Sequence, residues 1–261
     1  MVQSNEEPGR PRRRRKSTSA SVSASDLAEI KAASVDDLQL INSKAMVCFV
    51  EGRKDEALSL ARAALLDASG RGGPFEAVVI LSYLPVLIAL APVDTARQAA
   101  ERSALLVTGR PGCEYLVSHA YYYALQVEIK AGDHDHAYSQ ANACIKFALR
   151  SRRHCEWLSS AWRYLGVLQA LKGQKLEAIV SLANAVSIAL EKPSDDPLVL
   201  ARSHDAAGRI MMDLRKWQLA EESFLNALTE FAKHAPNGAS EAAETWRRAS
   251  KVRSIRQGLG E

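Results

Sequence analysis

Apolar and small residues recur at helical spacing along most of the chain, and residues 162–186 show the pattern most clearly. The first half of this stretch places Trp162, Leu165 and Gly166 on one helical face. After Gly173, the second half places Ala178, Leu182 and Ala185 at i, i+4 and i+7. A very small residue lets two antiparallel helices approach closely, and a large one fills the space beside it. The stretch therefore predicts a helical hairpin that turns at Gly173, with Gly166 at the helix contact.

The same pattern of small and large residues occurs five times. The equivalent small residues are Ala57, Ala96, Ala137, Ala178 and Ala220. The intervals between successive members are nearly constant, at about 40 positions, and a period of this length is typical of a helical solenoid. In such a fold each hairpin packs on the next. The pattern predicts an all-α fold, an α-solenoid of about five helical hairpins.

Several of these positions resemble the tetratricopeptide repeat. Trp162, Leu165 and Gly166, followed by Ala178 and Leu182, match its motif, and Pro193 follows as a late proline. Ala220, Phe224 and Pro236 match its second half. The resemblance covers roughly residues 36–236. It implies a right-handed, tetratricopeptide-like array, which we assign to residues 26–236.

The repeats depart from the usual tetratricopeptide pattern in two ways. Their period is close to 40 residues, whereas the usual period is about 34; this makes them similar to the lengthened repeats of MalT-type regulators and kinesin light chains. The first two repeats are also degenerate. Lys44 and Ala45 replace the Leu–Gly pair, and Pro85 is expected to interrupt the first helix of the second repeat.

Two segments flank the array. Residues 1–25 are rich in Arg, Ser and Pro, and too poor in apolar residues to form a core, so they are predicted to be disordered. Residues 237–261 are predicted to form a capping helix and a short tail, because a solenoid needs its last apolar face covered. The expected buried stripe of this helix consists of Trp246, Ala249, Val252 and Ile255.

Net charge, cysteine spacing and the length of one apolar run indicate which classes of protein the sequence fits. The net charge of +4 arises in the first 25 residues, because the remainder holds 28 bases and 28 acids. The four cysteines lack the spacing of a zinc or redox motif, so we expect reduced thiols. The apolar run at residues 77–91 contains Pro85. This run is shorter than the roughly 18 residues that a membrane span needs, so it is predicted to be a buried helix.

A basic cluster stands in the N-terminal tail, made of Arg12, Arg13, Arg14, Arg15 and Lys16. It is compatible with nuclear import or anion binding. It also precedes Ser17, Thr18 and Ser19, which are candidate phosphorylation sites whose phosphates would offset the basic charge. A solubilising tail without a partner is the third interpretation, and the sequence leaves all three open.

No residue cluster indicates catalysis, a cofactor or a metal. The turn at residues 132–137 contains Asp133, His134, Asp135 and His136, which are metal-ligand types. Side chains at i and i+2 of a helix diverge, so the two histidines are not expected to converge, and Asp133 is expected to cap the following helix. The glycine-rich residues 70–74 lack the Lys–Ser/Thr of a phosphate loop. We therefore expect a protein that is not an enzyme.

The concave groove is the remaining candidate site. In tetratricopeptide arrays the first helix of each hairpin lines this groove. By that resemblance the lining residues are Asn42, Tyr122, Gln126, Arg163, Val167, Arg202, Asp205 and Arg209. They do not match the Lys and Asn positions with which chaperone-docking members hold a terminal carboxylate. A plain solvated helix face is the alternative interpretation, although Arg163 and Arg209 suit an acidic peptide.

Three functions follow as hypotheses. The first is a non-catalytic interaction scaffold, adaptor or complex subunit that binds a peptide or helix of another protein in the groove. The second is a MalT-type signalling or transcriptional regulator acting through a partner. The third is nucleic-acid binding by the basic tail; the neutral body makes this unexpected for the folded part. We expect no membrane association and a cytoplasmic location, or a nuclear one if residues 12–16 direct import.

Overall fold

The computed structural model describes residues 44–192 and 194–260. Residues 44–50 are helical. The helices that follow are α3 (Lys54–Ala68), α4 (Gly73–Leu90), α5 (Val93–Val107), α6 (Glu114–Ala131), α7 (His134–Arg150), α8 (Leu158–Leu171), α9 (Lys175–Glu191), α10 (Val199–Asp213), α11 (Trp217–Lys233) and α12 (Ala239–Leu259). The basic tail cluster, its candidate phosphorylation sites, Asn42 and Pro193 lie outside the described residues.

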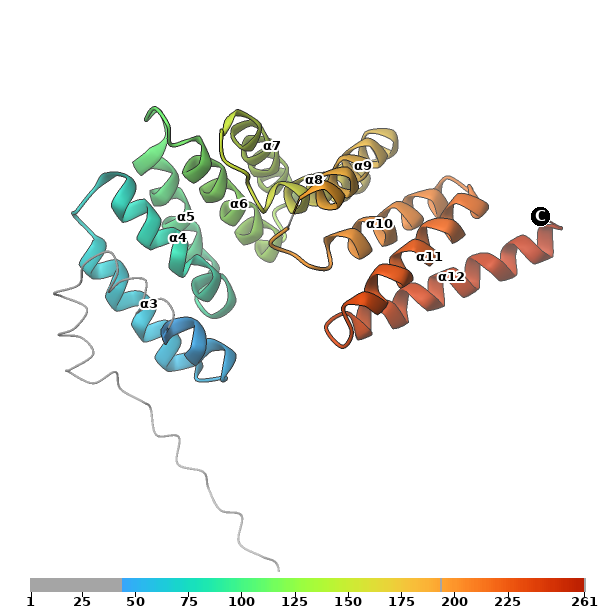
Figure 1. Cartoon of the computed structure of the whole chain (residues 1–261), viewed down its shortest axis with the longest axis horizontal. Coiled ribbons are helices and arrows are strands. Elements are labelled where there is room, and N and C mark those ends of the chain that lie inside the picture. The colour runs from blue at the N-terminus through green and yellow to red at the C-terminus, as the bar shows by residue number, and fades with distance from the viewer. Residues whose placement is uncertain (1–43, 193, 261) are drawn as a thin grey trace, which may run out of the picture.

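These helices form a curved array, in which each helix packs against the next one in the chain (Figure 1). Contacts within the pairs α4–α5, α6–α7, α8–α9 and α10–α11 define successive hairpins, and α12 packs against α11. No strand occurs among the described residues. The predicted all-α solenoid of helical hairpins is confirmed.

The five recurrent alanines hold the same place in the structure. Each is the fourth residue of the second helix of its hairpin, in α3, α5, α7, α9 and α11 respectively. None of the five is more than 2% exposed. A methyl side chain at this point keeps the paired helix close, since a longer one would push the two backbones apart.

Gly166 occupies the matching position on α8. A Cβ atom placed on it would lie 2.8 Å from Cγ of Leu182 and 3.0 Å from the backbone oxygen of Ala178. On α10, a Cβ atom on Gly208 would lie 2.7 Å from ring carbons of Phe224. Both glycines therefore act as contact residues within helices, as the pattern predicts for Gly166.

The residue five positions before the recurrent alanine lies in the turn of the hairpin, where the backbone conformation restricts the residue type. Gly173 takes this place in the α8–α9 turn with φ +79°, in the left-handed region that glycine enters without a steric penalty. Arg215 takes the corresponding place between α10 and α11, with φ 57°. The turn of the last hairpin therefore keeps the left-handed conformation, although the residue that adopts it is an arginine and not a glycine.

Helix α4 corrects one expectation about the second repeat. Pro85 lies inside α4, which continues to Leu90 and is not interrupted there. A proline removes one backbone hydrogen bond, and the tertiary packing of α4 against α3, α5 and α6 keeps the helix intact. By length and composition α4 could cross a membrane, but half of it is buried in this packing, as the sequence predicts for a core helix.

The buried stripe of α12 also differs from the prediction. Thr245, Ala249 and Val252 are buried, whereas Trp246 is 62% exposed. Two residues three positions apart are separated by about 300° around the helix axis, which is about 60° short of a full turn. A stripe with this spacing therefore drifts around the helix. The i, i+4, i+7 spacing from Thr245 stays on one side and packs against the array.

We predict that Arg215→Gly stabilises the protein, because it relieves a left-handed conformation that costs a non-glycine residue about 1–2 kcal/mol. Part of this gain is lost to the greater freedom of glycine in the unfolded chain. Chemical denaturation should show a higher free energy of unfolding. The reciprocal change Gly173→Arg is the matched control and should lower it; a destabilising Arg215→Gly would contradict the explanation.

Candidate protein-binding groove

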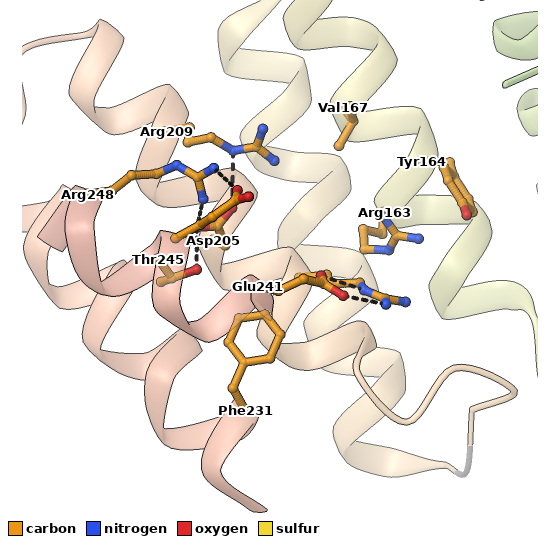
Figure 2. A pocket seen from close by; sticks show the side chains of 11 residues that line it. Arg163, Tyr164, Val167, Asp205, Arg209, Phe231, Glu241, Thr245 and Arg248 are labelled. Atoms are coloured by element: carbon orange, nitrogen blue, oxygen red, sulfur yellow. Dashed lines mark hydrogen bonds and ion pairs between the residues drawn. The ribbon is translucent and has the colours of Figure 1, made fainter. Parts of the chain in front are cut away.

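A cavity of about 430 Å³ opens between α8, α10 and α12 (Figure 2). Five of the predicted groove residues line it, namely Arg163, Val167, Arg202, Asp205 and Arg209. Six further residues complete the lining, namely Tyr164, Phe231, Glu241, Glu244, Thr245 and Arg248. The first helices of two hairpins and the terminal helix therefore bring these side chains to one place.

Asp205 is the centre of the polar network at one wall of the cavity (Figure 2). Its Oδ1 accepts hydrogen bonds from the Thr245 hydroxyl at 2.8 Å and from Arg248 Nη1 at 2.9 Å. Its Oδ2 lies 3.2 Å from Nε of Arg209. A buried carboxylate surrounded by such donors is satisfied without water, so Asp205 fixes α12 against α10.

Arg202 makes the second link between α10 and α12. Its Nε and Nη2 donate to the two carboxylate oxygens of Glu241 at 2.9 and 2.7 Å, and its Nη1 donates to Asp196 at 2.8 Å. The paired hydrogen bond with Arg202 lowers the pKa of Glu241 below its ordinary value. Arg202 thus donates from all three of its nitrogens to carboxylates of the chain itself.

Arg163 differs from the other arginines of the cavity. Its side chain is only 11% exposed, and its nearest carboxylate oxygen, on Asp196, is 3.9 Å from Nη2. Its Nε is buried and has no hydrogen-bond partner among the described residues. The guanidinium lies over the ring of Tyr164, with 4.1 Å from Cζ to the ring centroid. Since Asp196 is already bonded to Arg202, carboxylates of the described chain do not saturate the donors of Arg163.

A second cavity of about 410 Å³ continues the groove. It shares Val167, Arg209 and Arg248 with the first and adds an apolar part that includes Leu171, Ile210 and Met212. The two cavities make one groove with a charged end and a mixed end, where apolar side chains stand beside Asp213 and Lys251. Such a groove suits an extended or helical segment that carries both charged and apolar side chains.

Two predicted lining residues lie elsewhere. Gln126 on α6 is half-buried and outside both cavities, and Tyr122 is 5% exposed. Burial, followed by the charge of Asp195 and a hydrogen bond with it, raises the pKa of Tyr122. Tyr122 also packs against Trp157, with ring centroids 6.2 Å apart. It is therefore a core residue between hairpins, and the prediction that it lines the groove is wrong.

An aromatic cluster next to Tyr122 explains its burial. His119 stacks on Trp157 with ring centroids 3.9 Å apart and an interplanar angle of 8°, and Tyr123 lies 4.6 Å from His119. Trp157 Nε1 donates to Ser118 at 2.9 Å. Burial lowers the pKa of His119 to about 4, so the ring is neutral at pH 7. The cluster joins α6 to Trp157, the residue that precedes α8.

The sequence does not predict the α12 residues of the groove, because its pattern there indicates only a capping helix. Glu241, Thr245 and Arg248 follow each other at i, i+4 and i+7, which is a polar stripe of helical period. That stripe is the feature of the sequence from which the α12 residues of the groove could have been predicted. Its interpretation needs the position of α12 beside α10, which no local pattern provides.

The turn at residues 132–137 behaves as predicted for a helix cap. The Asp133 side chain accepts from the backbone N–H of His136 at 3.1 Å and contacts Nδ1 of the same histidine at 2.7 Å. Within the described ranges, no group of three or more His, Cys, Asp or Glu side chains is arranged to hold a metal ion.

Comparisons with known proteins identify the fold. No protein-family model matches the chain, and no curated protein matches it in sequence. The crystal structure of BtubC (BKLC) from P. vanneervenii aligns with a TM-score of 0.62 and 19% identity, covering 79% of this chain and 83% of that one. The crystal structure of the MamA protein aligns with a TM-score of 0.52 and 15% identity, covering 76% and 93%. These likenesses are consistent with a tetratricopeptide-like helical repeat.

We predict that the contribution of the α12 carboxylate pairs to stability is lost in acid. Glu221 on α11 accepts from Arg253 at 2.7 Å and Arg256 at 2.8 Å, and these bonds lower its pKa, as Arg202 does for Glu241. A carboxylate with a lowered pKa stabilises the fold above its ordinary value of 4.5 and loses this effect as the pH falls below it.

Urea unfolding of the wild type and of the double variant Glu221→Gln/Glu241→Gln, between pH 7 and pH 3, measures how much the two carboxylates contribute to stability. The difference in free energy of unfolding should be largest at pH 7 and should shrink as the pH drops below 4.5. A difference that stays constant over the range would show that the carboxylate charges do not hold α12.

Proposed function

We propose that this chain is a non-catalytic interaction scaffold, an adaptor or complex subunit, that binds a peptide or helix of another protein along the groove between α8, α10 and α12. A partner segment with a carboxylate followed by apolar side chains fits the groove best. The carboxylate would lie at Arg163, and the apolar side chains would lie towards Leu171 and Met212.

The observation that carries the proposal is the state of Arg163. A buried guanidinium with an unused Nε is costly to leave without an acceptor, and a partner carboxylate that reaches it would form a charge-assisted hydrogen bond in a partly desolvated place. The neighbouring arginines are engaged by Asp205, Asp196 and Glu241. Their pairing leaves Arg163 as the anchoring residue of the groove.

A regulator of the MalT-type class is the second candidate, and the repeat period of about 40 residues favours it. Such a regulator would act through a partner held in the same groove. Both functions therefore require Arg163 to bind a partner carboxylate. Cytoplasmic location, and the roles of the N-terminal basic cluster in nuclear import or nucleic-acid binding, stay predictions.

Site-specific photo-crosslinking in cells tests the proposal. We predict that a photoreactive amino acid at Val167 in the groove gives a discrete crosslinked protein, because a partner segment passes within reach of that side chain. The same amino acid at Ser139, exposed on α7, is the control and should not give that product. The crosslink from position 167 should be strongly reduced by Arg163→Gln, which keeps a polar side chain but removes the charge.

The proposal fails if position 167 gives no product, or if Arg163→Gln leaves the yield unchanged while thermal unfolding shows that the variant is folded. Equal products from positions 167 and 139 would indicate nonspecific contact and would also contradict it.

A further inference from the structure

The second helices of the hairpins expose a common outer face, opposite the buried alanine. It consists of the second, sixth, ninth and thirteenth positions of each helix, and of the sixteenth in the 17-residue helices α7, α9 and α11. In α3, α5, α7 and α11 this set contains at least three polar residues, of which one or more is charged. In α7, for example, the face consists of Asp135, Ser139, Asn142, Lys146 and Leu149.

Helix α9 departs from the other four. Its outer face consists of Leu176, Val180, Ala183, Ser187 and Leu190, and carries no charge. Leu176 is 72% exposed, Val180 60% and Leu190 71%, and Ala183 and Ser187 are exposed as well. The fold does not bury this face, so intramolecular packing does not explain its apolar character.

The spacing of these residues is that of a helix-pairing seam. They follow each other at intervals of four, three, four and three residues, the heptad pattern with which one helix packs along another. The seam spans about 21 Å of helix at 1.5 Å per residue. We call Leu176, Val180, Ala183, Ser187 and Leu190 the α9 seam.

One edge of the α9 seam is acidic. Glu177, Asn184 and Glu191 follow each other at intervals of seven residues and flank the seam on the same side. Both carboxylates belong to exposed residues, and neither has an ion-pair partner within the described part of the chain. A helix that packs on the seam would meet these two negative charges along its own edge, which favours basic residues there.

The same edge argues against antiparallel pairing with a second copy of the chain. If two α9 helices packed antiparallel about a two-fold axis at Ala183, Glu177 of one copy would lie on the same side as Glu191 of the other, and at nearly the same level. Two like charges would then face each other on either side of the axis. A partner with the opposite charge avoids this repulsion.

We propose that the α9 seam docks an amphipathic helix of a partner protein, with leucine-type residues on the seam and Lys or Arg along the edge that faces Glu177 and Glu191. This surface lies on a different helix from those that line the groove, and its use does not depend on the proposed function. The chain would then hold two partner segments at once, one at each surface.

Two fluorescent peptides, each three heptads long, test the proposal with the full chain. Both carry leucine at the a and d positions of every heptad; one carries Lys at the flanking e and g positions, and the other carries Glu. By fluorescence anisotropy the Lys peptide should bind at least tenfold more tightly than the Glu peptide. The double variant Glu177→Lys/Glu191→Lys should reverse this preference.

Matched variants locate the binding. Val180→Asp, within the seam, should weaken binding of the Lys peptide at least tenfold. Leu105→Asp, at an exposed leucine on the outer face of α5, should leave it unchanged. Arg163→Gln should also leave it unchanged, which separates this surface from the groove. Thermal unfolding verifies that each variant is folded.

The proposal is overturned if the chain does not bind the Lys peptide, if the two peptides bind equally, or if Leu105→Asp and Val180→Asp weaken binding to the same degree. It is also overturned if light scattering shows a dimer that Val180→Asp dissociates, since the seam would then be occupied by a second copy of the chain.

Discussion

The close approach of paired helices at small side chains is the constraint on which the array depends. Each second helix buries an alanine at its fourth residue, and Gly166 and Gly208 remove even the methyl group on the facing helices α8 and α10. The neighbouring large side chains, such as Leu182 and Phe224, fill the space that the small ones leave. A solenoid consists of many such local contacts, so each hairpin must satisfy this geometry by itself.

This constraint decides how much of the structure could be predicted from the sequence. The hairpins, their register and the contact role of Gly166 follow from local spacing, because neighbouring helices in the chain are also neighbours in space. The groove was predictable only in part. Arg163, Val167, Arg202, Asp205 and Arg209 line the cavity, and their role in binding stays a prediction. Tyr122 is instead held in an aromatic cluster with Trp157, which belongs to the next hairpin. The α12 side of the groove likewise depends on an ion pair and a hydrogen bond between helices that are distant in the sequence.

The two proposed binding surfaces lie where the packing constraint ends. On the groove side, α10 and α12 pair most charges through Asp205, Glu241 and Arg202, whereas the buried Nε of Arg163 has no partner among the described residues. On the outer side, α9 keeps an apolar seam that no helix of the described chain covers. Both features are unfavourable for an isolated chain in water and become favourable with a partner, which supports a protein that works by holding others together.

The most direct test of the packing constraint is the stability of Gly166→Ala compared with Gly258→Ala. Gly258 lies in α12 with no atom within 4 Å of a Cβ placed on it, so alanine there should be neutral or stabilise the helix by up to about 1 kcal/mol. Alanine at position 166 should lower the free energy of unfolding by about 1–3 kcal/mol, because α8 and α9 must move apart. If Gly166→Ala is as stable as Gly258→Ala, close helix contact does not determine the array.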